Sequence, residues 1–361
     1  MSISATNARY LDETLLWLCS IASPIGEEGA LSRAVEERVR KASFASSIER
    51  VGDSIVATLG ARENSKTRIA LVGHLDTVRT ENGPARIENG RCFGAGSSDM
   101  KSGLAVMLAV AELADKPFDC EIKLVFYARE EGPYAENELG DVLDKVPSLS
   151  EIDLAVCLEP SDNRVHLGCA GSLHARVTFE GRTSHSARPW EGANAVHAAA
   201  PFLARIAALK PRDSVIDGQL YRTVTSVTSA RDLGRGRNIV PDRFELNVNH
   251  RFAPCFSVED AEKEVTSLVG SDAQIVFTDR SPGAMPNASN RLVRALIDSG
   301  VRGVAPKQAW TDVARFAARG VAAVNFGPGE NAQAHQKNES TSLELVHEGY
   351  EIVKRWITAI S

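Results

Sequence analysis

Four short apolar segments of the chain are each followed by side chains that can bind a metal or carry a proton. Residues 69–72, 122–127, 154–158 and 321–326 are strand-like, because each is a short run rich in apolar residues such as Val, Ile, Leu and Phe. Helix-like stretches such as residues 102–114, rich in Ala, Leu, Met and Val, lie between them. Strands that alternate with helices predict a layered α/β domain with an at least partly parallel sheet.

The middle of the chain has a different pattern, in which apolar and polar residues alternate. A period of two indicates half-exposed strands, and hence an antiparallel sheet with one face in solvent. We therefore predict a discontinuous α/β domain, residues 1–172 and 285–361, with a smaller α+β domain inserted at residues 173–284. The alternating segments are residues 173–179, 221–227 and 244–252.

Functional sites in open α/β sheets form beyond the carboxyl ends of the strands. Each of the four apolar segments delivers a histidine, aspartate or glutamate to that position, and one more aspartate precedes the helix-like stretch. These side chains are the nitrogen and oxygen ligands that zinc, cobalt and manganese accept. The sequence therefore predicts a metal site at these strand ends. Its candidate residues are His74, Asp76, Asp99, Glu130, Glu131, Glu159 and His335.

The spacing within two of these pairs indicates separate tasks. His74 and Asp76 are two residues apart on an extended segment, so both point to one side and the carboxylate can orient a metal-binding imidazole. Glu130 and Glu131 are adjacent and point apart, so one can bind metal while the other takes a proton from water. Each pair alone has an ordinary explanation as a local hydrogen bond or as solvated charge. The prediction rests on their coincidence at strand ends.

Composition and charge exclude several other classes of protein. The net charge of −6 and the sequence pI near 5.8 give no sign of the basic face that nucleic-acid binding needs. No apolar run approaches the roughly 18–20 residues that span a bilayer, and the first residues lack the pattern of a signal peptide. The six cysteines are scattered without a Cys-x-x-Cys pair, which suits a reducing compartment. We expect a cytoplasmic protein that binds neither nucleic acid nor membrane.

Six motifs occur in order along the chain: His74-Leu75-Asp76-Thr77-Val78, Asp99-Met100-Lys101-Ser102-Gly103, Glu130-Glu131, Glu159-Pro160, residues 181–185, and finally His335. In these motifs the chain resembles the dinuclear-zinc peptidases, the family of glutamate carboxypeptidase, acetylornithine deacetylase, aminoacylase and succinyl-diaminopimelate desuccinylase. The resemblance extends over essentially the whole chain. It implies a layered α/β/α catalytic domain with an inserted domain that dimerises and serves as a lid.

The resemblance also implies a cofactor, namely two divalent metal ions, typically zinc, with cobalt and manganese as alternatives. Asp99 would bridge the two ions. His74 and Glu159 would complete the first site, and Glu131 and His335 the second.

Further roles follow from the same resemblance. Glu130 would be the general base and then the acid, and Asp76 would orient the imidazole of the neighbouring ligand. The Asp99–Met100 peptide bond would be cis. The chain would form a homodimer, in which His185 reaches the active site of the partner subunit.

Four segments look most like the actinobacterial type of succinyl-diaminopimelate desuccinylase: residues 185–190, 192–197, 249–254 and 310–316. This implies hydrolysis of the amide bond of N-succinyl-L,L-2,6-diaminopimelate to succinate and L,L-diaminopimelate, a step of lysine and cell-wall precursor synthesis. The substrate carries three carboxylates, which suit the bidentate fork of arginine. The inserted domain offers Arg222, Arg231, Arg235, Arg237, Arg243 and Arg251, some of them expected to pair with nearby acids. By resemblance the substrate contacts are Arg251 and Asn238, with Ser172, Arg188 and Thr311 behind them.

Two alternatives stay open at this point. Within the same chemistry, the chain could be an N-acetylornithine deacetylase or a glutamate-type carboxypeptidase. A non-catalytic binding protein on the same scaffold is disfavoured, because neither a metal ligand nor the base is missing from the sequence. All three enzyme readings share a small N-acyl amino-acid substrate.

Overall fold

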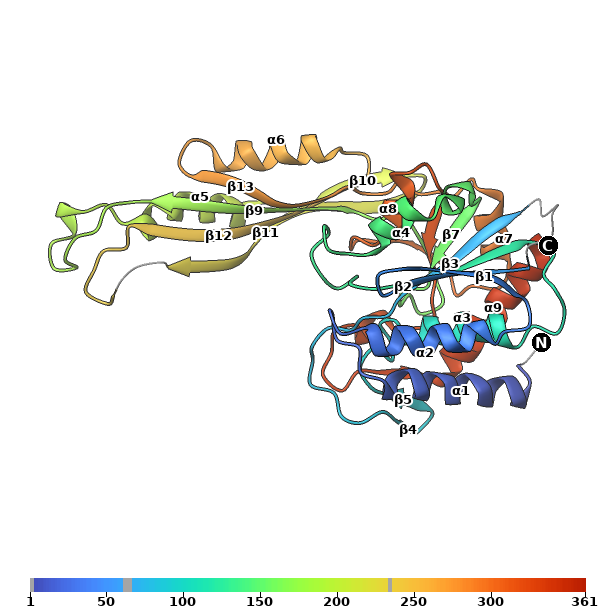
Figure 1. Cartoon of the computed structure of the whole chain (residues 1–361). Coiled ribbons are helices and arrows are strands. Elements are labelled where there is room, and N and C mark those ends of the chain that lie inside the picture. The colour runs from blue at the N-terminus through green and yellow to red at the C-terminus, as the bar shows by residue number, and fades with distance from the viewer. Residues whose placement is uncertain (1–2, 61–66, 233–235) are drawn as a thin grey trace. The chain divides into compact units, whose positions relative to one another are not determined.

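The computed structural model describes residues 3–60, 67–232 and 236–361. The chain divides into two compact units (Figure 1). The large unit comprises Met1–Gly168, Pro286–Ala305 and Asp312–Ser361, and the small unit comprises Cys169–Met285 and Pro306–Thr311. The catalytic and lid roles assigned to residues 1–172 plus 285–361 and to residues 173–284 remain a prediction.

An eight-stranded mixed sheet forms the centre of the large unit, in the order β1-β2-β6-β3-β7-β15-β8-β14. Its neighbours β6, β3, β7 and β15 run parallel and coincide with the four apolar segments, which confirms the partly parallel sheet. Beyond their first residues β3 and β6 are wholly buried, because a sheet covered on both faces has no solvent side. The strands are β1 (Ala45–Val51), β2 (Ser54–Leu59), β3 (Arg68–His74), β6 (Glu121–Tyr127), β7 (Leu154–Cys157), β8 (Val165–Leu167), β14 (Val304–Pro306) and β15 (Ala323–Asn325).

Helices cover both faces of this sheet, as Figure 1 shows. α3 packs against α1, α2 and α9 on one face, and α4 and α8 lie on the other. α3 is buried from Lys101 to Ala111, because it lies between the sheet and its neighbouring helices. The predicted α/β/α layering is confirmed. The helices are α1 (Ala5–Ser20), α2 (Gly29–Arg40), α3 (Lys101–Glu112), α4 (Leu139–Lys145), α7 (Arg291–Asp298), α8 (Val313–Ala317) and α9 (Leu343–Ile360), with 3-10 turns η1 (Pro147–Glu151) and η3 (Asn331–Gln333).

A small antiparallel sheet of three strands joins distant parts of the large unit. β5 (Arg91–Phe93) pairs with β4 (Arg86–Glu88) and with β16 (Ser340–Ser342). Strands of three residues are too short to produce a hydrophobic period, so they could not be predicted from the sequence. The pairing matters because β16 follows closely after His335 and ties that part of the chain to the segment ahead of Asp99.

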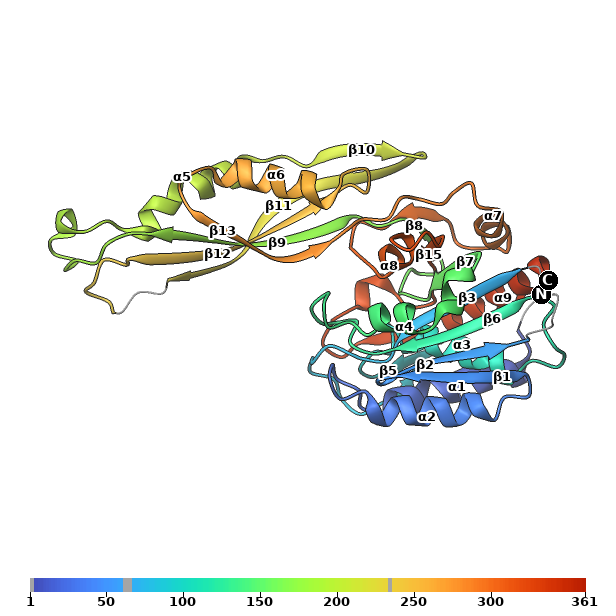
Figure 2. The ribbon, with the colours of Figure 1, turned by 45° about the horizontal axis from the view of Figure 1, so that its top comes forward.

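The small unit is built on a five-stranded antiparallel sheet in the order β10-β11-β12-β9-β13. α5 and α6 lie side by side on one face of it (Figure 2). Buried residues alternate with more accessible ones along β12, which confirms the predicted sheet with one wet face. Ser257 is the N-cap of α6, and Asp260 completes a capping box with it. The elements are β9 (Gly171–Glu180), η2 (Pro189–Glu191), α5 (Ala195–Ala208), β10 (Arg212–Ile216), β11 (Gln219–Asp232), β12 (Arg243–Phe252), α6 (Val258–Val269) and β13 (Gln274–Ser281).

Candidate metal centre and active site

The residues predicted to form the metal site come together in the large unit, where β3, β6 and β7 end. The side chains form three groups of donors, and within each group the donor atoms lie within 4.8 Å of one another. Two of these groups share Asp99, so cations placed in them would share one carboxylate. The third includes Glu130, so proximity alone does not separate the base from the ligands. The groups are His74–Asp99–Glu159, Asp99–Glu131–His335 and His74–Glu130–Glu131.

Asp76 contacts this centre through both its backbone and its side chain. His74 Nδ1 lies 3.0 Å from the carbonyl oxygen of Asp76 and 3.7 Å from its carboxylate. The carboxylate accepts hydrogen bonds from the backbone amides of Glu130, at 3.0 Å, and Glu131, at 2.9 Å. The backbone carbonyl therefore orients the imidazole, and the carboxylate fixes the segment that carries both glutamates, a role that the sequence spacing did not indicate.

The turn ahead of α3 carries Asp99. Gly96 in this turn has a φ of 76°, and a Cβ there would lie 2.6 Å from a methyl group of Thr77, so glycine is required. The amide of Lys101 donates to the carbonyl of Gly96 at 2.7 Å and closes the turn. The Asp99–Met100 peptide bond is cis, as the family resemblance implies. Asp99 is buried to 9% exposure, with its carboxylate 3.2 Å from His74 Nε2.

Crowded carboxylates shift the protonation of the centre. Burial raises the pKa of the Glu130 carboxyl well above its ordinary value, and the charge of Glu159 raises it further. Burial opposes protonation of His74, but its hydrogen bond to Asp99 and the surrounding carboxylates raise its pKa well above the usual value. Both shifts reflect carboxylates that lie close together in a buried site. The donor set therefore fits divalent cations, which would supply the balancing positive charge.

His335 stands at the accessible side of the centre. Its Nε2 lies 3.0 Å from Glu131 and 3.6 Å from Asp99, and its side chain is 54% exposed. The hydrogen bond to Glu131 raises the pKa of His335 to about 9. His335 also has a φ of 61°, a left-handed conformation that is uncommon for a residue with a side chain.

Zinc binding to the metal-free protein is expected to release protons at pH 7. With a pKa of about 9, His335 is protonated at that pH and must lose its proton to bind a metal. The apparent zinc affinity should therefore rise up to about tenfold per pH unit, per proton displaced, until pH passes the pKa. Calorimetric titration in two buffers of different ionisation enthalpy measures the proton count. A binding enthalpy that is independent of the buffer at pH 7 would contradict the expectation.

Two of the predicted substrate contacts lie opposite each other in the small unit. Arg251 of β12 and Ser172 of β9 are register partners across the sheet. Arg251 Nε donates to Asn249 at 3.1 Å, and the amide group of Asn249 lies 3.5 Å from the hydroxyl of Ser172. Thr311 belongs to the same unit, where its carbonyl lies 3.7 Å from Cys169 Sγ.

The other three predicted residues gather beyond the far end of β9. The amide of Ser186 donates to the carbonyl of Asn238 at 2.8 Å, and His185 forms an isolated bridge with Ile239. Arg188 makes an ion pair of 3.1 Å with Glu191. The antiparallel pairing of β9 and β12 continues in the same direction through residues 181–186. The part of β9 from Ser172 to Glu180 therefore separates Ser172 from this segment. At about 3.4 Å per residue, that separation is roughly 27 Å. One small molecule cannot contact both groups within one chain.

The arginines of the small unit differ in their surroundings. Arg222 pairs with Asp213 at 3.2 Å, and Arg176 pairs with Glu245 at 3.6 Å. Among the predicted arginines that the structure describes, Arg251 is half-buried and the others are exposed; Arg235 lies outside the described residues. Burial lowers the pKa of Arg251 without removing its charge at neutral pH. Arg251 therefore best fits a specific carboxylate contact.

Two buried acidic residues near the centre were given no role from the sequence. Glu339 accepts hydrogen bonds from three backbone amides of the turn that carries Asp99. Asp312 accepts hydrogen bonds from the hydroxyl of Tyr127 at 2.8 Å, the amide of Asn137 at 2.9 Å and the guanidinium of Arg315 at 2.6 Å. The Tyr127 ring in turn packs edge-on against the imidazole of His74, with ring centres 6.2 Å apart. Neither acid directly follows an apolar strand. That position was the pattern that indicated most of the other candidate residues.

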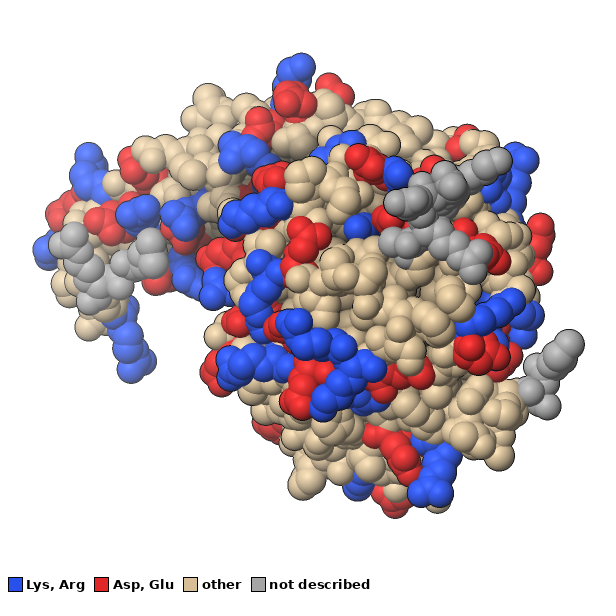
Figure 3. Space-filling model, turned by 45° about the vertical axis from the view of Figure 1, so that its right-hand side comes forward, with Lys and Arg blue, Asp and Glu red and all other residues tan. Residues whose placement is uncertain are grey.

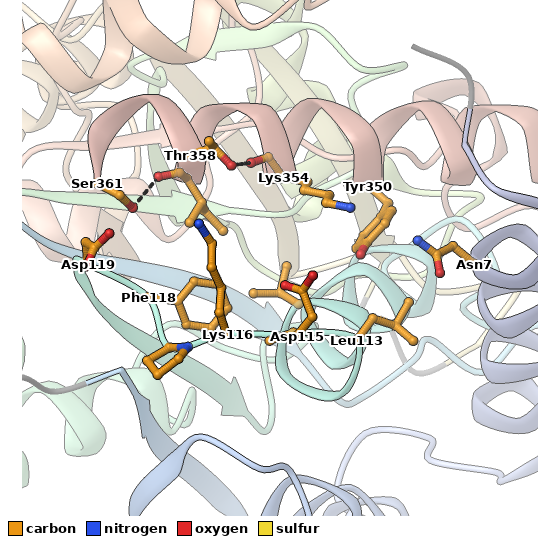
Figure 4. A pocket seen from close by; sticks show the side chains of 14 residues that line it. Asn7, Leu113, Asp115, Lys116, Phe118, Asp119, Tyr350, Lys354, Thr358 and Ser361 are labelled. Carbon is orange, nitrogen blue, oxygen red and sulfur yellow. Dashed lines mark hydrogen bonds between the residues drawn. The ribbon is translucent and has the colours of Figure 1, made fainter.

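A separate pocket of about 380 Å³ opens between α9 and the segment that joins α3 to β6 (Figure 4). It includes Phe118, Tyr350 and the charged side chains of Lys116 and Lys354. It borders the beginning of β6, whereas the metal ligands follow the end of that strand, so the pocket is not part of the centre. On the face drawn in Figure 3, basic and acidic side chains are interspersed. No helix within the described ranges has the length and apolarity to cross a membrane.

Comparison with known proteins assigns this chain to a family. Residues 70–359 match the family model described as Peptidase family M20/M25/M40. The chain belongs to this peptidase family. Membership in the M20/M25/M40 family confirms the resemblance seen in the motifs and identifies the chain as a hydrolase of amide bonds.

Members of the M20/M25/M40 family with curated names are similar over nearly their whole length. Succinyl-diaminopimelate desuccinylase of Corynebacterium glutamicum is 33% identical over 350 residues, which cover 94% of each chain. The DapE protein of Mycobacterium tuberculosis, named as a candidate desuccinylase, is 36% identical over 94% of this chain and 96% of its own. Among solved structures, a tripeptidase of Staphylococcus aureus superposes with a TM-score of 0.81 at 19% identity, covering 98% of both chains. The last similarity concerns the fold alone.

Proposed function

We propose that the chain hydrolyses the amide bond of N-succinyl-L,L-2,6-diaminopimelate, releasing succinate and L,L-diaminopimelate. The observation that supports this most is the pair of donor groups that share Asp99, in a chain 33% identical to a named desuccinylase over 94% of its length. Neither finding would suffice alone. The donor groups support metal-dependent hydrolysis, and the relatives support the succinyl amide as its target.

In the proposed reaction the cations, when bound, would stabilise the negative charge that develops on the oxygen of the attacking water and on the carbonyl oxygen of the amide. Glu130 takes a proton from the attacking water. The C–N bond then breaks, and Glu130 returns the proton to the departing amine. Asp76 keeps the Glu130 segment in place through the two backbone amides.

The substrate carries carboxylates that the small unit can recognise. Arg251 offers a half-buried guanidinium, and the facing Ser172 hydroxyl offers a neutral donor. Bidentate pairing of arginine with a carboxylate is both strong and directional. We therefore assign Arg251 and Ser172 to one carboxylate of the substrate, and Thr311 of the same unit to its surroundings.

The purified protein is expected to prefer N-succinyl-L,L-diaminopimelate clearly over N-acetylornithine and acyl-glutamates. The expected difference in kcat/KM is about tenfold or more, because a site that hydrogen-bonds polar groups of its substrate rejects analogues that lack them. Arg251→Lys should weaken this preference mainly through KM, because an ammonium cannot form the bidentate fork. Arg222→Lys, at an exposed arginine, is the matched control. Steady-state kinetics on the three substrates decides. Equal turnover on all of them would remove the substrate name while leaving the hydrolase.

The runner-up activities are not favoured by the comparisons. The relatives with 33% and 36% identity carry desuccinylase names rather than names of an N-acetylornithine deacetylase or a carboxypeptidase.

Zinc is the metal proposed for both sites, with cobalt and manganese as alternatives, because nitrogen and oxygen donors bind all three metals. Metal analysis of protein purified without added salts identifies the native ion. We also propose a cytoplasmic location, which cell fractionation tests.

We further propose a homodimer in which His185 and Asn238 of each chain serve the active site of the other. The separation of these residues from Ser172 along β9 supports this, since they cannot meet one ligand within a single chain. Trp190, close to His185, is 75% exposed and Ile239 is 38% exposed, so apolar surface lies at the same end of the unit. A partner subunit would cover it.

Mixed dimers test this arrangement directly. Inactive His185→Ala and Glu130→Ala chains are mixed, dissociated and reassociated. If His185 acts across the interface, each heterodimer contains one complete site and random mixing restores about a quarter of the wild-type activity. If His185 acts within its own chain, no activity returns. Sedimentation analysis of the unmodified protein provides the control, and a monomer would exclude the proposal.

A further inference from the structure

Glu339 is an acidic residue that is 2% exposed, and its carboxyl group accepts hydrogen bonds from backbone amides. Its Oε1 accepts from the amides of Ser98 and Asp99, and its Oε2 from the amide of Gly96, each at 2.8 Å. Three convergent N–H groups form an anion-binding concavity of the kind that backbone turns provide. Here a side chain of the same chain fills that concavity.

The backbone of Glu339 is held on both sides as well. Its amide donates to the side-chain oxygen of Asn82 at 2.8 Å, and its carbonyl accepts from the amide of Gly94 at 3.1 Å. The pairing of β16 with β5 begins at the next residue. The backbone of Glu339 is therefore held by contacts with residues outside the 96–99 turn that its carboxylate holds.

A carboxylate suits these contacts better than any neutral side chain. It only accepts hydrogen bonds, so both oxygens can face amides, whereas a glutamine would turn an NH₂ group toward at least one N–H donor. A buried charge is costly unless it is hydrogen-bonded or paired. Lys101 Nζ donates to the carbonyl of Ile21 at 2.9 Å. Burial lowers the pKa of Lys101, and the attraction of Glu339 for its ammonium group partly offsets this effect.

The turn held in this way carries the one donor that both metal groups share. Asp99 belongs to the group with His74 and Glu159 and to the group with Glu131 and His335. Glu339 lies four residues after His335, so a single side chain connects the segment of one ligand to the backbone amide of the shared ligand. A displaced turn would move Asp99 relative to both groups.

We propose that Glu339 is a positioning residue of the metal centre, which holds the turn of residues 96–99 so that Asp99 can serve both cations. Residues that orient metal ligands typically contribute about 10–100-fold to metal affinity or activity. The inference rests on the proposed metal centre and is independent of the identity of the substrate.

Substitution of Glu339 tests the inference through zinc binding. Glu339→Gln is expected to weaken zinc binding by about 10–100-fold, measured by competition with a chromophoric chelator. At saturating zinc kcat should fall while KM stays within about twofold, because the substrate contacts are unchanged. Glu339→Asp keeps the charge but is shorter by one methylene, so an intermediate loss is expected. Glu344→Gln, an exposed position in the first turn of α9, is the matched control.

The melting temperature of the metal-free proteins separates positioning from a purely structural role. A lower melting temperature with unchanged zinc affinity would overturn the inference. If Glu339→Gln is not recovered folded, Glu339→Asp decides, and unchanged zinc affinity in that variant counts against it. Wild-type protein that binds no zinc would overturn the metal centre itself, whereas wild-type binding of two equivalents with unaffected variants overturns the role of Glu339 alone.

Discussion

Glu130→Gln is expected to lower kcat by roughly 10²–10⁴-fold, the usual contribution of a positioned acid or base, while the protein keeps its zinc. The amide oxygen and nitrogen of glutamine fill the same space as the carboxylate but cannot shuttle a proton at neutral pH. The backbone of residue 130 should stay in place, because Asp76 holds it through the amide and not through the side chain. Turnover and zinc content are measured on the same preparation.

Two results would contradict this assignment in different ways. Turnover within tenfold of the unmodified enzyme would mean that another group carries the proton. Loss of one zinc equivalent would mean that Glu130 is a ligand, as its membership of the group with His74 and Glu131 allows. Glu136→Gln, an exposed glutamate in the following loop, should change neither quantity.

Asp99→Ala is expected to abolish zinc binding at both positions, whereas His335→Ala should weaken it at one. The difference follows from the sharing of Asp99 between two donor groups, while His335 belongs to one of them. Loss of a shared carboxylate also removes the negative charge that holds two cations close together. Zinc equivalents retained after dialysis, near zero for the first variant and near one for the second, provide the measurement.

Stability gives the control for this pair of variants. Metal binds the folded state, so the metal-loaded wild-type protein should melt at a higher temperature than its metal-free form. Asp99→Ala should show no such difference, and His335→Ala an intermediate one. Equal zinc retention in both variants would show that Asp99 does not serve both sites.

The candidate metal ligands could be predicted from the sequence because most of them belong to a local pattern. His74, Glu131 and Glu159 closely follow apolar strands, and parallel strands bring their carboxyl ends to one edge. The layered fold could be predicted for the same reason, since a buried parallel strand appears in the sequence as a continuous apolar run. The alternation of β12 likewise marks a sheet with one wet face.

Contacts between distant segments that use backbone groups produce no such pattern in the sequence. Glu339 acts on the amides of a turn about 240 residues earlier, and any residue type can supply an amide. The carboxylate of Asp76 similarly binds two amides across the strand ends, although the spacing suggested a partner on its own strand. The three-residue strands β4, β5 and β16 are fixed by each other and not by hydrophobic period.

The unbroken length of β9 has a consequence for how this chain can vary. Because side chains alternate along a strand, a deletion of one residue would turn Ser172 away from Arg251, whereas a deletion of two would preserve the face and bring the two ends of the strand about 7 Å closer. In a dimer whose active sites contain residues of both subunits, such a deletion would change the distance between those residues and leave their chemical groups unchanged. In the proposed dimer, the length of β9, in steps of two residues, would thus set the distance between its two ends.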